Sequence, residues 1–133
     1  MTTPHLPVIQ MIPQRHTTDC SVATLAMLLG VSYEVALLAI RLPRVLTHGV
    51  QLRIVRQAAK RLGHPLQLRR QIDAENDTGI LGVVSQVWDF EHLVILKEGI
   101  IVDAQDTSIW DFDSYMAAHQ ARAVSLLTLE EGR

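Results

Sequence analysis

The chain has 133 residues, of which 48% are hydrophobic and 20% are charged, and its formal net charge at pH 7 is −2. This composition predicts one folded domain over residues 1–133 and excludes an intrinsically disordered chain, which would have few hydrophobic residues and a high net charge. The small net charge also argues against nucleic-acid binding, which needs many basic side chains to neutralise phosphates.

Two features bear on the compartment and on membrane insertion. Cys20 is the only cysteine, so no intrachain disulfide can form, and the N-terminal sequence lacks the basic and apolar regions of a secretory signal. We therefore expect a cytoplasmic protein. Residues 21–40 match the roughly 20 residues that cross a bilayer, but Gly30 and Glu34 interrupt them. Two short helices, without a membrane span, are the better interpretation.

Helical patterns come first along the chain. Thr18 and Asp19 precede an apolar run, and their side chains are expected to cap a helix over about 20–29. Ser32 is expected to cap a second helix, over about 33–41, in the same way.

The pattern changes from helical to alternating in the middle of the chain. Apolar residues at helical intervals predict a third helix over 51–63, with Gly63 just past its end. Strands are predicted at 65–71, at 79–87, in the two halves of 92–104 and at 122–129, with a short helix near 111–119 that begins at Asp111 or Asp113. Helices followed by an antiparallel sheet indicate an α+β domain, with the helices packed on one face of the sheet.

The hairpin predicted around a two-residue turn at 98–99 places two chemically important residues together. In this register Ile95 faces Val102, so His92 and Asp103 lie on one face of the sheet as diagonal neighbours. A carboxylate beside an imidazole orients the ring and stabilises its charged form, as a general base requires. A three-residue turn would move Asp103 to the other face and remove the pairing.

Cys20 is expected in the first turn of its helix. Unpaired backbone N–H groups and the helix dipole favour a negative charge there, and a cysteine is nucleophilic in its anionic form. Gln14, six residues earlier, carries an amide that could donate a hydrogen bond beside the backbone N–H of Cys20, as an oxyanion hole requires. Taken singly, however, a lone helical cysteine is most often a core residue, and a loop glutamine is most often exposed.

These segments resemble the motifs of one enzyme family. The stretches QRHTTDCSVATLAMLLGVSYE, from Gln14, and HLVILKEGIIVDAQD, from His92, are similar to the Cys and His segments of the bacteriocin-processing, double-glycine peptidases, which are papain-like cysteine peptidases. The resemblance implies a papain-like α+β fold with Cys20 as nucleophile and His92 as general base and acid. It also implies that Asp103 orients His92 and that Gln14 is an oxyanion-hole donor.

The chain departs from the family pattern in places. Ser21 follows the cysteine where the family usually has Gly, and Ala104 follows the aspartate where it usually has Pro. The spacing from His to Asp is also shorter than usual. None of these differences removes a group with an implied catalytic role.

Three functions are compatible with these features. The first is a cysteine peptidase that hydrolyses a peptide bond, such as a leader-peptide or isopeptide bond, through a Cys-His-Asp triad and a thioester acyl-enzyme. The second is another papain-like chemistry, an amidase or an acyltransferase. The third is a catalytically inactive domain of the same fold that binds a peptide.

Partners and cofactors follow from the same features. We expect a peptide or protein substrate and no cofactor. A metal site formed by His16, Cys20 and His92 is disfavoured. Zinc sites usually contain closely spaced pairs of ligands, and a single pair, His16 and Cys20, with one distant third ligand is weak support for such a site. Trp88 and Phe90, which closely precede His92, are candidate substrate-binding residues, although core packing explains an aromatic side chain equally well.

Overall fold

The computed structural model describes residues 9–16, 19–41, 52–88 and 90–130. The helices in these ranges are α1 (Cys20–Leu29), α2 (Tyr33–Ile40), α4 (Leu52–Arg61) and α5 (Phe112–His119). The strands are β1 (Leu66–Arg69), β2 (Thr78–Ser85), β3 (His92–Lys97), β4 (Ile100–Asp103), β5 (Ser108–Asp111) and β6 (Ala121–Leu129). They form one antiparallel sheet in the order β1-β6-β2-β3-β4-β5. The predicted α+β class is confirmed.

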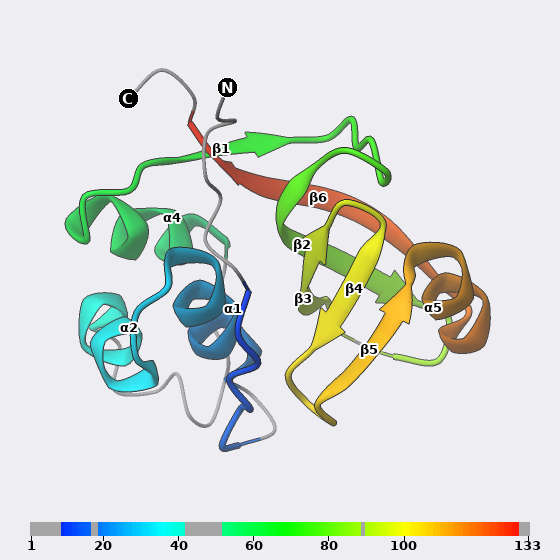
Figure 1. Ribbon diagram of the computed structural model, residues 1–133, viewed down its shortest axis with the longest axis horizontal. Helices are drawn as coiled ribbons and strands as arrows, with labels where there is room; N and C mark the ends of the chain where they lie inside the picture. The colour runs from blue at the N-terminus through cyan, green and yellow to red at the C-terminus, as the bar shows by residue number, and fades with distance from the viewer. Residues whose placement is uncertain (1–8, 17–18, 42–51, 89, 131–133) are drawn as a thin grey trace.

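Helices lie on both faces of the sheet (Figure 1). Buried residues of α1, α2 and α4 form one core with Ile80, Ile95 and Leu127 of the strands. On the other face, Tyr115 of α5 packs in a second core with Val94. The N-terminal helices pack on the C-terminal sheet as predicted, but the expectation that all helices share one face is wrong for α5. The central strands are apolar on both sides, so both faces of the sheet have to be covered.

The first two helices are separated where the sequence predicted. Gly30 ends α1 with a left-handed backbone, φ 70°, which glycine adopts without steric cost. The Ser32 side chain accepts a hydrogen bond from the backbone N–H of Val35 and so caps α2. Among the described residues no single helix is long and apolar enough to cross a membrane, and the α1–α2 pair is bent by 116°.

The start of α1 differs from the prediction. Asp19 occupies the N-cap position, but its side chain makes no hydrogen bond to the helix, so the capping role predicted for it is wrong. Its carboxylate instead accepts hydrogen bonds from the backbone N–H groups of Arg15 and His16 in the preceding loop. Thr18, the other predicted cap, lies outside the described residues.

The later helices agree closely with the prediction. Gly63 lies just beyond the end of α4 with a φ of 83°, while Gln51, the predicted first residue, is outside the described ranges. Of the two candidates for the start of the last helix, Asp111 is the cap of α5. Its carboxylate accepts a 3.1 Å hydrogen bond from the backbone N–H of Ser114.

The β3–β4 hairpin has the predicted turn and register. Glu98 and Gly99 have φ values of 49° and 89°, as a tight two-residue hairpin turn requires, and Ile95 pairs with Val102. Strand β5 was not predicted. It has four residues and pairs with β4 at one edge of the sheet, so its alternation is too short to distinguish a strand from a loop.

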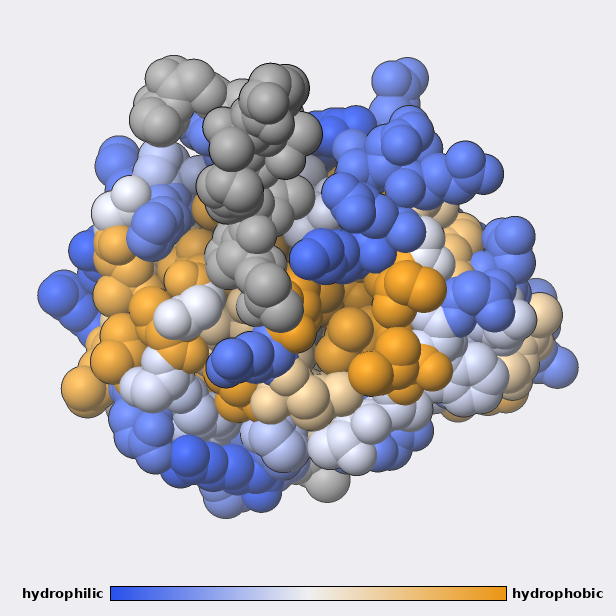
Figure 2. Space-filling view, in the orientation of Figure 1, coloured by the Kyte–Doolittle hydropathy of each residue, from blue (hydrophilic) through white to orange (hydrophobic). Residues whose placement is uncertain are grey.

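Apolar side chains are exposed over the helices and over β4 and β5 (Figure 2). On the two strands, Ile100 and Ile109 are exposed, with 40% and 68% of their surface accessible. Residues 9–16 run between α1 and these strands (Figure 1). The N-terminal segment therefore borders both the helical part of the fold and the apolar surface of the sheet.

Candidate active site

His92 and Asp103 are paired by the hairpin register. His92 is the first residue of β3 and Asp103 the last residue of β4, and the Nε2 atom of His92 lies 3.0 Å from Oδ1 of Asp103. Both residues are buried, with 3% and 4% of their surface exposed. The structure therefore brings together the two groups that the register placed on one face.

Cys20 completes the group from the other part of the fold. It is the first residue of α1 and is partly exposed, and its thiol lies close enough to His92 to raise the pKa of the imidazole. Because Nε2 of His92 faces Asp103, the other ring nitrogen, Nδ1, is the one available to the thiol. The imidazole is thus held between a thiol and a carboxylate.

These contacts govern the charge of His92. Burial alone would lower the pKa of the imidazole, but the hydrogen bond to Asp103, the hydrogen bond to Cys20 and the charge of Asp103 outweigh burial and raise it to about 9. Burial opposes ionisation of Asp103 as well, yet its pKa is lowered by the hydrogen bond and charge of His92 and by the backbone N–H of Gln105. The pair is therefore an imidazolium and a carboxylate at neutral pH.

Gln14 lies in the segment that crosses between the helices and the sheet. Its backbone N–H donates a 3.1 Å hydrogen bond to the carbonyl oxygen of Ala104, the residue after Asp103. Its side-chain Nε2 donates to the carbonyl oxygen of His16 at 2.6 Å. A primary amide nitrogen carries two N–H groups, so this bond occupies one of them and leaves the second for a ligand.

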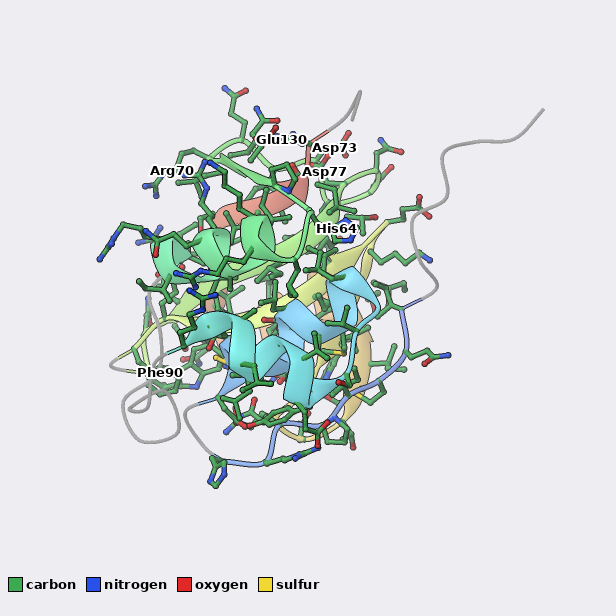
Figure 3. All side chains as sticks on the ribbon, turned by 90° about the vertical axis from the view of Figure 1, so that its left-hand side faces the viewer. His64, Arg70, Asp73, Asp77, Phe90 and Glu130 are labelled. Carbon is green, nitrogen blue, oxygen red and sulfur yellow. The ribbon has the colours of Figure 1, made fainter. Side chains whose placement is uncertain are left out.

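Trp88 and Phe90 both pack against the edge of His92. Their ring centroids lie 5.6 and 6.4 Å from the imidazole, at interplanar angles of 79° and 89°. The two rings also stack on each other with centroids 5.8 Å apart. Phe90 is 53% exposed and lies at the edge of the molecule in Figure 3. The two predicted substrate-binding residues therefore form an accessible aromatic wall beside His92.

The alternative of a metal site finds no support. His16, one of its three predicted ligands, is exposed in the loop before α1. Among the described residues there is no group of three or more His, Cys, Asp and Glu side chains that could hold a metal ion.

Comparisons with known proteins bear on the fold. No protein-family model and no curated protein sequence matches the chain. A double glycine motif protease from an AMS/PCAT transporter, solved in complex with the leader peptide, matches with a TM-score of 0.66 and 18% identity, over 96% of this chain and 94% of that chain. The peptidase domain of Streptococcus ComA, a bifunctional ABC transporter of a quorum-sensing pathway, matches with a TM-score of 0.61 and 14% identity, over 92% and 100%. The fold is that of a double-glycine peptidase domain.

The likeness confirms the predicted resemblance and the papain-like α+β fold. It extends over nearly the whole chain, so the helices, the sheet and their order all belong to the double-glycine peptidase fold. The likeness is one of fold, and the roles of individual residues rest on the geometry of the site.

One contact of Asp103 was missed in the sequence. The hydroxyl of Tyr115, in α5, donates a 2.8 Å hydrogen bond to Oδ2 of Asp103. The alternation of the strands could not indicate this hydrogen bond, because Tyr115 comes from a helix that packs on the second face of the sheet. The predicted helix near 111–119 was the only available signal.

A second missed feature lies directly before Cys20. Asp19 is fully buried and accepts hydrogen bonds from the backbone N–H groups of Arg15 and His16, at 2.9 and 3.0 Å, and from the Tyr33 hydroxyl of α2. Its side chain therefore ties the loop between Gln14 and Cys20 to α2.

Proposed function

We propose that the chain is a cysteine peptidase with Cys20 as nucleophile, His92 as general base and acid, and Asp103 as the orienting carboxylate. The observation that carries the proposal is the position of His92, which is hydrogen-bonded to Asp103 on one side and lies close enough to Cys20 on the other for the thiol to raise the pKa of the imidazole. A nucleophile, a base within its reach and a third group that orients the base are the parts that covalent acyl transfer requires.

The first half of the reaction forms an acyl-enzyme. The proton of Cys20 already lies on His92 before the peptide binds, since His92 is an imidazolium at neutral pH, and the anionic Sγ attacks the carbonyl carbon of the peptide to form a C–S bond. As this bond forms, the carbonyl oxygen gains negative charge. The imidazolium of His92 then protonates the amine as the C–N bond breaks, and a thioester remains on Cys20.

The second half releases the product. His92, now neutral, accepts a proton from water, whose oxygen attacks the thioester carbonyl. The C–S bond breaks, the sulfur leaves as the thiolate beside the imidazolium of His92, and a carboxylic acid is released. Asp103 keeps one ring orientation throughout, because Nε2 donates to its Oδ1 in both charge states.

Gln14 is proposed to stabilise the negative oxygen of the tetrahedral intermediate. The second N–H of its side-chain amide and the backbone N–H of Cys20, in the first turn of α1, are the two donors. The hydrogen bond from the amide to His16 holds the amide of Gln14 in one orientation, so little reorganisation is needed during the reaction.

The substrate is proposed to be a peptide. One structural neighbour is a double glycine motif protease bound to a leader peptide, which supports a peptide with two glycines before the scissile bond as the first substrate to test. Because His92 protonates the leaving amine and Trp88 and Phe90 pack against His92, we assign these two aromatic residues to the leaving-group side of the active site.

Alkylation of Cys20 by iodoacetamide tests the proposal directly. Cys20 is the only cysteine, so every alkylated molecule reports this site. In the native protein we expect alkylation below pH 7, and in His92→Ala we expect the rate at that pH to fall, because the imidazolium that stabilises the reactive anion is gone. His64→Ala is the matched control, since His64 is exposed and lies well apart from Phe90 in Figure 3.

Product analysis separates the peptidase from the alternatives. Mass spectrometry of a Gly-Gly peptide incubated with the protein should show two fragments and no transfer to an added amine, and Cys20→Ala should show none. Transfer to the amine would indicate an acyltransferase. If Cys20 is inert in the folded protein and Cys20→Ala binds the peptide fully, the remaining function is that of a catalytically inactive domain that binds a peptide.

A further inference from the structure

The carboxylate of Asp103 is held by groups from different elements of the fold. Its Oδ1 atom accepts from Nε2 of His92 and from the backbone N–H of Gln105, both at 3.0 Å. Its Oδ2 atom accepts from the hydroxyl of Tyr115 at 2.8 Å. Tyr115 is fully buried and belongs to α5, so this hydrogen bond comes from a different element than the hairpin that carries the other two contacts.

The hairpin alone does not orient the carboxylate. The register brings His92 and Asp103 to one face, but the terminal torsion of an aspartate side chain is soft, and its two oxygens can exchange places. The hydrogen bond from Tyr115 identifies Oδ2 as the oxygen turned away from His92. A buried oxygen without a donor would carry a desolvation penalty, so each oxygen needs its own partner.

We propose that Tyr115 is a positioning residue of the site, whose hydroxyl holds the Asp103 carboxylate in the orientation that accepts a hydrogen bond from His92. The link to catalysis rests on the proposed peptidase function. Tyr115 touches neither the substrate nor the reacting atoms, and it acts only through Asp103.

The surroundings of Tyr115 suit this role. Its ring stacks on that of His119, with centroids 4.1 Å apart, and meets the ring of Trp110 edge to face at 5.9 Å. These contacts fix the direction of the hydroxyl. Burial and the charge and hydrogen bond of Asp103 raise the pKa of the phenol, so Tyr115 remains a protonated donor over the working pH range.

The titratable groups in and around the Asp103 contacts come from four parts of the fold. His92 on β3 and Tyr115 on α5 contact the carboxylate directly, while Cys20 at the start of α1 acts on both of these residues and Asp106 in the turn after β4 acts on Tyr115. Only Tyr115 can be changed to an isosteric residue that lacks the donor and carries no change in formal charge. Tyr115→Phe is therefore the informative variant.

The titration of the Asp103 carboxyl carbon by ¹³C NMR tests the proposal without any need for peptidase activity. A hydrogen bond to the charged form lowers a carboxyl pKa, so we expect the pKa of Asp103 in Tyr115→Phe to rise by about one unit. The acid limb of Cys20 alkylation should also move to higher pH, because a less firmly oriented carboxylate stabilises the imidazolium of His92 less. An unchanged carboxyl titration would overturn the proposal.

Tyr33→Phe is the matched control. It removes a hydrogen bond of the same kind, from a buried tyrosine to the carboxylate of Asp19, and it should destabilise the protein without moving the Asp103 titration. A general loss of packing would affect both variants alike, whereas a positioning role predicts a shift in Tyr115→Phe alone. Equal shifts in the two variants would contradict the proposal.

Fluorotyrosine provides a second measurement if Tyr115→Phe does not fold. The chain has two tyrosines, so in Tyr33→Phe protein 3-fluorotyrosine labels Tyr115 alone. The fluorinated phenol is a stronger donor, and the pKa of Asp103 should fall below its value in unlabelled Tyr33→Phe. A rise or no change would overturn the proposal. If Cys20 were inert in the wild type, the proposed peptidase function would be wrong. The titration of Asp103 in Tyr115→Phe and in the fluorotyrosine-labelled protein would still test the role of Tyr115.

Discussion

The backbone N–H of Gln14 donates a 3.1 Å hydrogen bond to the carbonyl oxygen of Ala104. This contact joins the segment before α1 to the residue after Asp103, across the boundary between helices and sheet. The proposed oxyanion donor and the proposed orienting carboxylate therefore share one backbone connection. The side chain of Gln14 can be replaced without loss of this hydrogen bond, because the bond joins only main-chain atoms.

Replacement of Gln14 separates transition-state stabilisation from activation of the thiol. Gln14→Ala removes the side-chain donor, and we expect kcat to fall by about 10²- to 10³-fold with little change in KM. The alkylation rate of Cys20 should stay near the wild-type value, because His92 and Asp103 are untouched. Steady-state kinetics on a Gly-Gly peptide and iodoacetamide labelling provide the two readouts.

Gln10→Ala is the control for this prediction. Gln10 is an exposed residue of the same segment, so its replacement should leave both kcat and alkylation unchanged. If Gln14→Ala retained full kcat, the oxyanion role would be wrong. If the variant lost alkylation together with kcat, Gln14 would act on the thiol instead.

The charge of His92 makes the stability of the protein depend on pH. The pKa of this imidazole is about 9 in the folded protein against 6.5 for an ordinary histidine, so the protonated form is favoured by folding. The resulting stabilisation, on the order of 3 kcal/mol, is fully present below pH 6.5 and is lost as the pH rises through 9. Asp103 acts at low pH. Because its pKa is lowered in the folded protein, its charged form stabilises the fold at pH values above the ordinary carboxyl pKa, and this contribution is lost as the pH falls through the lowered pKa.

Urea unfolding at several pH values measures this effect. The free energy of unfolding of the wild type should decline between pH 6.5 and 9. In His92→Gln, which keeps a polar side chain but cannot be protonated, the decline should be much smaller. The same slope in both proteins would show that His92 is not the group responsible.

The sequence predicted those parts of the fold that depend on local patterns. The change from helical to alternating periodicity located the helices and the central strands, and the Glu98-Gly99 turn determined the hairpin register. Because side chains alternate along a strand, this register was enough to place His92 and Asp103 on one face.

The remaining features depend on contacts between distant elements. Asp19 was predicted to cap α1 from its position alone, but Tyr33 and the loop N–H groups compete for its carboxylate. Tyr115 reaches Asp103 from α5, whose side of the sheet is decided by packing. Side-chain partners of this kind have no signature in local sequence, because the same residues could cap, pack or remain exposed.

Asp19→Asn should weaken the fold and disorder the loop that carries Gln14. Among the described residues, the partners of the Asp19 carboxylate are all donors, namely two backbone N–H groups and the Tyr33 hydroxyl. An asparagine has one acceptor oxygen and would turn its NH₂ group toward another donor. We expect a loss of about 2 kcal/mol in the free energy of unfolding, measured by urea denaturation.

Asp73→Asn is a suitable comparison for Asp19→Asn. Asp73 also accepts hydrogen bonds from a backbone N–H and a side chain, those of Glu75 and Asn76, but all three residues are exposed in the turn before β2. Water can replace these bonds, so the loss should be below about 0.5 kcal/mol. Equal losses in the two variants would contradict the role assigned to the buried carboxylate.

Two glycines of β2 should respond differently to alanine. A Cβ at Gly79 would collide with the backbone carbonyl oxygen of Leu127 and lie 3.0 Å from its carbonyl carbon, so β2 and β6 would have to separate. At Gly82 the collision is with the side chains of Glu91 and Ser125, and the exposed Glu91 can move away. We expect Gly79→Ala to cost about 3 kcal/mol and Gly82→Ala about 1 kcal/mol in unfolding free energy. A larger loss for Gly82→Ala in urea denaturation would mean that Ser125 or Glu91 is held more rigidly than the backbone of β6.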